Sequence, residues 1–155
     1  MVNQQGTYAL ILEGRSSRNI QIGRLGRLAL KPGYYLYVGS AFGPGGLKAR
    51  LAHHLKPAPK PHWHIDYLRR YTKPVEIWYT TDSVRREGDW VANIINLPHA
   101  EIACPGFGAS DSEDVSHLFS FPHKPDFAGF RRIIETVPNH APVHSNRQIS
   151  SIHDR

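Results

Sequence analysis

The 155-residue sequence has little cysteine, no long apolar run and, over its first half, few acidic residues. Its one cysteine, Cys104, excludes an internal disulfide framework and a structural zinc site built from cysteines. No apolar run approaches the roughly 18 residues that a membrane span needs. The apolar run at residues 8–12 is too short for a signal peptide, and no cleavage pattern follows it. We therefore expect a soluble, cytoplasmic protein with no membrane partner.

The scarcity of acidic residues makes the charge of the chain uneven. Residues 1–70 hold 11 lysines and arginines against two acidic residues, a formal charge of +9. Residues 71–155 hold 8 basic residues against 11 acidic ones, a formal charge of −3. This asymmetry predicts an anionic partner that is met mainly by the first half. An unevenly charged, solvated surface without such a partner would also explain it.

Length and patterning predict one domain over residues 1–137, followed by a loose C-terminal tail over 138–155. Alternating or β-branched runs bounded by turn signals predict strands at residues 7–12, 20–23, 27–31, 34–39, 75–81, 101–104 and 116–121. Helical spacing predicts helices at residues 47–56, 62–71, 90–97 and 127–135. This order indicates an α+β fold with a mainly antiparallel sheet flanked by helices.

Two tyrosine-bearing segments stand out among the predicted strands. Gly6-Thr7-Tyr8 opens the first strand, and Tyr37-Val38-Gly39 closes the most strongly patterned one. If the two strands are neighbours, both phenols reach one edge or face of the sheet. A glycine-rich loop over residues 40–46 then leads into a helix that carries Arg50. Without further context, the simpler interpretation is that both rings are ordinary strand aromatics that fill a core.

Together these segments resemble the GIY-YIG nuclease superfamily. The run GYYLYVGSAFGPGGLKARLAHHL at residues 33–55 is similar to its small stand-alone branch of Uri-type endonucleases, whose domain is also found fused to DNA glycosylases. HWHIDYL at 62–68 and the segments GFGASD and SHLF within 106–119 are similar to further parts of that branch. The resemblance implies a metal-dependent endonuclease that hydrolyses branched, nicked or duplex DNA. The spacing between the tyrosines is long, which implies a basic hairpin inserted at residues 15–31.

The resemblance also implies roles for individual residues. Tyr8 and Tyr37 occupy the positions of the tyrosines that help to activate water, and a base role would require nearby cations to stabilise the phenolate. Arg50 matches the helix arginine that holds the scissile phosphate, for which a planar guanidinium is well suited. His54 lies one helical turn beyond Arg50 and could handle a proton, or could equally be an uncharged surface histidine. Lys48 would meet a flanking phosphate, or only water.

The implied metal ion is Mg²⁺ or Mn²⁺, held by a single helix-borne glutamate. Glu87 matches that position best, and Asp89 is the alternative; Glu87 is thus expected to be both a catalytic residue and the metal ligand. Acidic residues at a helix start also favour the helix dipole, which would explain both without a metal.

Further residues are expected to contact DNA around the tyrosines, Arg50 and Glu87. Gly39 and the histidines of the His62-x-His64-x-Asp66 motif are expected to bind DNA or to wall the active site. A zinc site on that motif, or a structural role, is also open. No role is expected for His53. The three tryptophans are expected in the core: Trp63, Trp78 and Trp90.

Two other functions fit the same sequence. One is a nucleic-acid-binding domain of this fold that has lost cleavage and keeps the basic half. The other is a metal-binding or interaction protein that uses the ten histidines. A homodimer is also possible, since one small active site attacks one strand and duplex cleavage needs a second copy or a second event.

Overall fold

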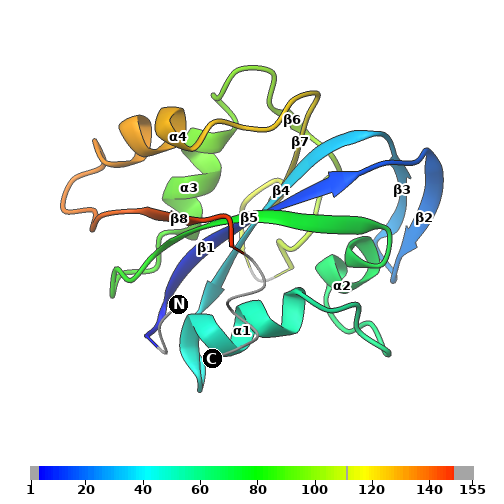
Figure 1. The fold of residues 1–155 in the computed structure, drawn as a ribbon, viewed down its shortest axis with the longest axis horizontal. Helices are drawn as coiled ribbons and strands as arrows, with labels where there is room; N and C mark the ends of the chain where they lie inside the picture. Colours follow the sequence, from blue (N-terminus) through cyan, green and yellow to red (C-terminus); the bar gives the residue numbers. More distant parts are fainter. Residues whose placement is uncertain (1–3, 111, 149–155) are drawn as a thin grey trace.

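A computed structural model describes residues 4–110 and 112–148 of the chain. It confirms the α+β class, with a mainly antiparallel sheet and helices packed against it (Figure 1). The strands are β1 (Gly6–Gly14), β2 (Arg18–Ile22), β3 (Gly26–Leu30), β4 (Gly33–Ala41), β5 (Thr72–Thr80), β6 (Glu101–Ile102), β7 (Leu118–Phe121) and β8 (His144–Asn146). The helices are α1 (Gly46–His54), α2 (His64–Arg69), α3 (Glu87–Ile94) and α4 (Phe127–Ile134).

The main sheet has the strand order β6-β7-β4-β1-β5-β8, and its pairings are antiparallel. Strands β1 and β4 pair over nine residues each, from Gly6 opposite Ala41 to Gly14 opposite Gly33. This pairing confirms that the two tyrosine-bearing strands are neighbours. Strand β1 lies between β4 and β5 inside the sheet, which explains why its apolar run is buried almost throughout.

Two apolar cores cover the two faces of this sheet, because side chains alternate along each strand. Tyr8 and Leu10 of β1 belong to the core that is shared with α1, α2 and the β2–β3 hairpin. Ala9 and Ile11 belong to the other core, which α3 and α4 complete. Figure 1 shows the two pairs of helices on opposite sides of the strands.

The predicted hairpin insertion is confirmed as a separate two-stranded sheet, β2–β3. Its apolar residues on one side, such as Ile22 and Leu30, are buried in the first core. Its basic residues are all exposed: Arg15, Arg18, Arg24, Arg27 and Lys31. The hairpin therefore adds positive charge to the side of the sheet that carries α1, α2 and Tyr8.

The prediction of a loose tail from residue 138 is wrong for the residues that the structure describes. Val143 is buried, and β8 pairs with the edge of β5 with Ile77 opposite Asn146. The polar sequence of β8 has no apolar alternation, so its strand depends on the partner that it finds in the fold. Residues 149–155 of the predicted tail lie outside the described residues.

Several element bounds also differ from the sequence prediction. The helix expected at 90–97 begins earlier, at Glu87, and the helix expected at 62–71 is confined to His64–Arg69. The strand expected at 101–104 has only two paired residues. Within the described residues, no helix combines the length and the apolar character that crossing a membrane requires.

Candidate active site

The two tyrosines lie on one face of the sheet, as the strand pattern predicts. In the β1–β4 register Tyr8 is opposite Gly39 and Tyr37 is opposite Leu10, so the two rings are diagonal neighbours. Their ring centroids are 6.3 Å apart. Tyr8 is fully buried, whereas Tyr37 is partly exposed. Of the two tyrosines, Tyr37 is therefore the less buried one.

His54 completes this group from helix α1. It shares the buried face of the helix with Leu47 and Leu51 and is only 2% exposed, so the alternative of a surface histidine is wrong. The Nε2 atom of His54 lies 2.6 Å from the Tyr8 Oη, which is a short hydrogen bond. The ring centroids of His54 and Tyr37 are 6.1 Å apart. Two strands and one helix thus bring three titratable rings into contact.

Burial keeps all three rings neutral. It raises the pKa of Tyr8 well above its usual value, an effect that Tyr37 reinforces and the charge of Arg50 only partly offsets. Burial also raises the pKa of Tyr37, and the negative charge of Glu87 adds to this. Burial lowers the pKa of His54 to about 3. At neutral pH the site therefore holds two protonated phenols and a neutral imidazole, and of the three rings only the imidazole keeps an unprotonated nitrogen that can accept a proton.

Arg50 lies on α1 four residues before His54 and is partly exposed. Its guanidinium carbon lies 4.6 Å from the ring centroid of Trp63, which is a cation–π contact. Trp63 is 37% exposed, so the prediction that it belongs to the core is wrong, while Trp78 and Trp90 are fully buried as expected. The ring of Trp63 holds the arginine at the mouth of the site.

Gly39 is buried, which corrects its predicted contact with DNA. A Cβ atom added there would lie 2.5 Å from the Tyr8 Oη, so the glycine makes room for the phenol that bonds His54. We expect Gly39→Ala to lower the free energy of unfolding by about 1–3 kcal/mol, as overpacking in a core does. Urea denaturation measures this. Gly43→Ala is the control, because an added Cβ at Gly43 meets nothing within 4 Å.

Glu87 is the first residue of α3 and reaches the site at the end of β4. Its Oε2 lies 3.3 Å from the His117 Nδ1, and its side chain is 25% exposed. Burial alone would raise the pKa of the Glu87 carboxyl, but hydrogen bonds from His117 and Ser40 and the charges of His117 and Arg85 hold the pKa below its ordinary value. The side chain is therefore an ionised carboxylate that solvent reaches. This donor fits a Mg²⁺ or Mn²⁺ ion.

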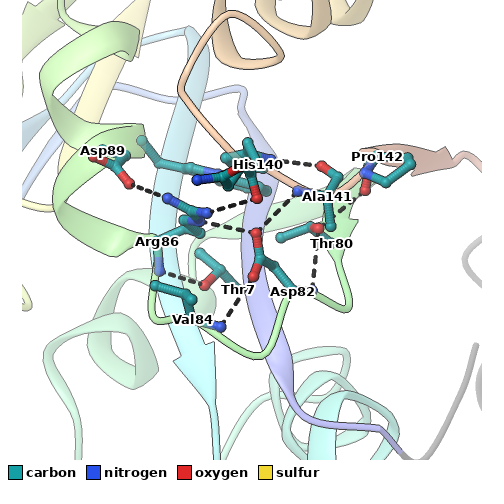
Figure 2. Close-up of polar contacts among 11 residues, drawn as sticks. Thr7, Thr80, Asp82, Val84, Arg86, Asp89, His140, Ala141 and Pro142 are labelled. Carbon is teal, nitrogen blue, oxygen red and sulfur yellow. Dashed lines mark hydrogen bonds and ion pairs between the residues drawn. The ribbon is translucent and has the colours of Figure 1, made fainter.

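Asp89, the alternative metal ligand, is part of a different contact. Its Oδ2 lies 3.1 Å from the Arg86 Nη1, and that guanidinium is itself buried (Figure 2). The carboxylate thus balances a structural arginine. This arrangement favours Glu87 over Asp89 as the ligand.

Sequence reasoning gave no role to His117, which precedes β7. Its Nε2 lies 2.9 Å from the Asp114 Oδ2, and its Nδ1 contacts Glu87 and the Val38 carbonyl. Burial alone would lower the pKa of His117, but the hydrogen bonds that its ring donates to the two carboxylates, and their negative charges, raise it. His117 therefore positions the Glu87 carboxylate. In the sequence, the only feature that draws attention to His117 is its position in the SHLF segment, whose pattern predicts a strand.

A hydrogen bond between segments far apart in the sequence explains why Glu87 lies near the tyrosines. The backbone N–H of Arg86 donates to the Thr7 Oγ1 at 3.1 Å. Because Thr7 precedes Tyr8 and Arg86 precedes Glu87, this bond fixes the start of α3 beside the start of β1. Figure 2 shows the bond within the network that surrounds the Arg86 guanidinium.

The other predicted contacts have different positions. Lys48 is partly exposed on α1, and His62 is exposed. His64 is partly buried, its pKa is lowered by that burial, and its Nδ1 accepts a hydrogen bond from the Gly108 N–H at 2.8 Å. The His64 ring therefore joins α2 to the loop under Tyr37, which is a structural contact and does not support the predicted contact with DNA.

Asp66 does not join the two motif histidines, so the alternative of a zinc site on His62, His64 and Asp66 has the wrong ligands. Its Oδ2 accepts the backbone N–H groups of His62 and Trp63, and its Oδ1 lies 3.0 Å from the His53 Nε2. Burial alone would raise the pKa of Asp66, but these hydrogen bonds keep the pKa below its usual value. His53, for which no role was expected, is thus the partner of a buried carboxylate.

Comparison with known proteins supports a family and no activity. A family model described as Domain of unknown function DUF123 matches residues 7–137, so the chain belongs to that family. No curated protein and no solved structure matches the chain. The matched range covers Tyr8, Tyr37, Arg50, His54 and Glu87.

Proposed function

We propose that this member of the DUF123 family is a metal-dependent endonuclease, which hydrolyses DNA phosphodiester bonds through a GIY-YIG-type active site. The observation that supports this best is the contact of Tyr8 with His54, beside Tyr37 and within reach of the Arg50 charge. These residues are the ones that the resemblance to the superfamily implies, and they come from three separate elements. A core without a function would not need a buried, neutral histidine next to an accessible arginine.

In this proposal Arg50 binds the scissile phosphate. Its planar guanidinium pairs with two phosphate oxygens and stabilises the charge that develops on the phosphorus centre. Trp63 keeps the guanidinium in place by its cation–π contact. The exposed arginines of the β2–β3 hairpin and Lys48 of α1 add the sequence-independent attraction to the DNA backbone.

Tyr37 orients the attacking water, because it is the less buried tyrosine of the pair. Tyr8 and His54 lie directly behind it and form the hydrogen-bonded pair that takes up the proton as the new P–O bond forms. The neutral imidazole makes this possible, since neither phenol ionises near neutral pH. The P–O bond to the leaving oxygen breaks, and that oxygen takes a proton from solvent.

Glu87 would hold a Mg²⁺ or Mn²⁺ ion, positioned by its contact with His117. Such an ion supplies Lewis-acid stabilisation of charge on the phosphate oxygens.

The direct test incubates the purified protein with nicked, branched and duplex DNA in Mg²⁺, in Mn²⁺ and in EDTA. We expect cleavage in either metal and none in EDTA. Tight, salt-sensitive binding without cleavage on any substrate would contradict the proposal and would support an inactive DNA-binding domain of the same fold.

The Glu87→Gln variant is expected to cleave at least about 100-fold more slowly. The amide keeps the shape of the side chain but lacks the negative charge that would bind the metal ion. Its affinity for DNA, measured without metal, should be unchanged or higher. Asp89→Asn is the matched control on the same helix and should cleave at nearly the wild-type rate. The reverse order of the two variants would move the metal ligand to Asp89.

A further inference from the structure

A second group of ligand atoms includes His54 and adds two side chains, His53 and Asp66, that the proposed reaction does not use. One ligand atom each from His53, His54 and Asp66 lie within 4.8 Å of one another. Among residues 4–110 and 112–148, this is the one group of three or more histidine, cysteine or acidic side chains with such spacing. The His53 Nε2 and the Asp66 Oδ1 are already 3.0 Å apart, close to the separation of two ligands on one metal ion.

The two ring nitrogens of His54 have different surroundings. Its Nε2 contacts the Tyr8 hydroxyl, but its Nδ1 is buried and has no hydrogen-bond partner. Burying an imidazole nitrogen without a partner costs free energy, and buried polar atoms in proteins are nearly always paired. The unpaired nitrogen belongs to a side chain that is 2% exposed and lies next to two further ligands. This observation, separate from the clustering itself, points to a missing partner.

Asp66 is arranged so that one of its oxygens remains available. Its Oδ2 accepts the backbone N–H groups of His62 and Trp63 before helix α2, while its Oδ1 faces His53. The side chain of His53 is 39% exposed, which opens a path from solvent to the cluster. The carboxylate is thus fixed by the helix start and presents a single oxygen to an incoming ion.

We propose that His53, His54 and Asp66 bind one divalent transition-metal ion, of which Zn²⁺ is the best fit. Two imidazole nitrogens and one carboxylate oxygen are a common zinc ligand set, and a water completes the tetrahedron. The nearby positive charges of Arg50 and Arg69 act on His54 and oppose a purely electrostatic cation site. The site should therefore select imidazole-binding metals over Mg²⁺, which prefers oxygen ligands and retains its waters.

The bound ion would determine whether His54 or Tyr8 donates the hydrogen in the bond between them. A metal on Nδ1 leaves the proton on Nε2, so the His54 ring donates to the Tyr8 oxygen. In this form His54 cannot take up the proton of the proposed reaction, so the metal-bound ring and the proton-accepting ring are alternative states of one imidazole. The ion would then connect helix α1, helix α2 and the buried phenol through one imidazole. This site is distinct from Glu87, and its existence does not depend on nuclease activity.

Titration of the metal-free protein with Co²⁺, in the absence of DNA and of Mg²⁺, tests the site. We expect the intense visible absorption bands of tetrahedral Co²⁺ with one equivalent bound, displaced by Zn²⁺ and unaffected by excess Mg²⁺. Asp66→Asn and His53→Ala should abolish the bands. The side-chain oxygen of the Asp66→Asn variant can still accept the backbone N–H groups at the helix start, and circular dichroism checks that this variant is folded. His123→Gln, which removes an exposed histidine elsewhere, should leave the bands unchanged.

Nitrogen NMR of the histidine rings identifies the bound atom. On addition of Zn²⁺ the His54 Nδ1 resonance should shift to that of a metal-bound nitrogen, with the proton on Nε2. Absence of the Co²⁺ bands, or bands that survive in both Asp66→Asn and His53→Ala, would overturn the proposal.

The outcome is separable from that of the proposed function. Glu87→Gln should keep the Co²⁺ bands, and their loss in that variant would place the ion on Glu87 instead and overturn this site. Co²⁺ bands in a protein that cleaves no DNA would support the site while contradicting the nuclease.

Discussion

Arg50→Ala is expected to slow DNA cleavage by about 10³-fold or more, the effect of removing an arginine that stabilises a phosphoryl transition state. Arg50 is the one accessible cation close enough to the tyrosine pair to influence the pKa of both phenols, among the residues that the structure describes. Single-turnover cleavage at saturating protein isolates the chemical step from binding. The thermal stability of the variant should change little, because the side chain is partly exposed.

Arg50→Lys distinguishes the two properties of this side chain. Lysine keeps the positive charge but lacks the planar guanidinium that can bind two oxygens at once. The cleavage rate should therefore remain far below that of the wild type if Arg50 binds two phosphate oxygens. Full activity of Arg50→Lys would reduce the role of Arg50 to a point charge. Equal activity of wild type, Arg50→Ala and Glu87→Gln would contradict the mechanism and would point to a contaminating nuclease.

Much of the fold was predictable because apolar alternation and helical spacing are local signals. The runs at residues 7–12 and 34–39 are strongly patterned, and they became the paired strands that carry Tyr8 and Tyr37. The leucines of the 47–56 segment likewise predicted a helix with one buried face. Once these strands pair as neighbours, the observed register places the two phenols on one face.

The parts that were not predictable depend on contacts between distant residues. His117 lies 30 residues from Glu87 along the chain, and no local sequence pattern around either residue indicates their contact. The pairing of His53 with Asp66 requires the turn between α1 and α2. Trp63 looks like a core residue by composition, and only the position of Arg50 explains its exposed face. Such polar and cation–π contacts carry no periodicity.

The C-terminal segment is a further case, because its order depends on buried charge in addition to the burial of Val143. Figure 2 shows that the Arg86 guanidinium lies between Asp82 and Asp89. It also donates to the Asn139 carbonyl at 3.0 Å. The Asp82 carboxylate in turn accepts the Ala141 N–H at 3.0 Å. These bonds connect residues 139–141 to the start of α3, and β8 follows directly.

Asp82→Asn is therefore expected to lower the free energy of unfolding by about 3–5 kcal/mol, the cost of breaking a buried ion pair by removing the charge of its buried carboxylate. The Asp82 side chain is 7% exposed, and both of its oxygens face N–H donors, so an amide would turn its own NH₂ toward one of them. Asp89→Asn removes the charge of the other carboxylate that contacts Arg86. Because the Asp89 side chain is 41% exposed, this variant should lower the free energy of unfolding by less than about 1 kcal/mol. Equal losses in the two variants would contradict the assigned role of burial.

The pH dependence of stability provides an independent check on the same pair. Burial alone would raise the pKa of Asp82, but hydrogen bonds from Ala141, Val84 and Arg86 hold the pKa below its ordinary value. The stabilisation is therefore complete above the pKa of the unfolded carboxyl, near about 4, and is lost as the pH falls through the lower folded pKa. Urea denaturation at several pH values should show the wild type converging on Asp82→Asn in acid. A constant difference between the two proteins down to the acid limit would mean that the Asp82 charge is not what stabilises the segment.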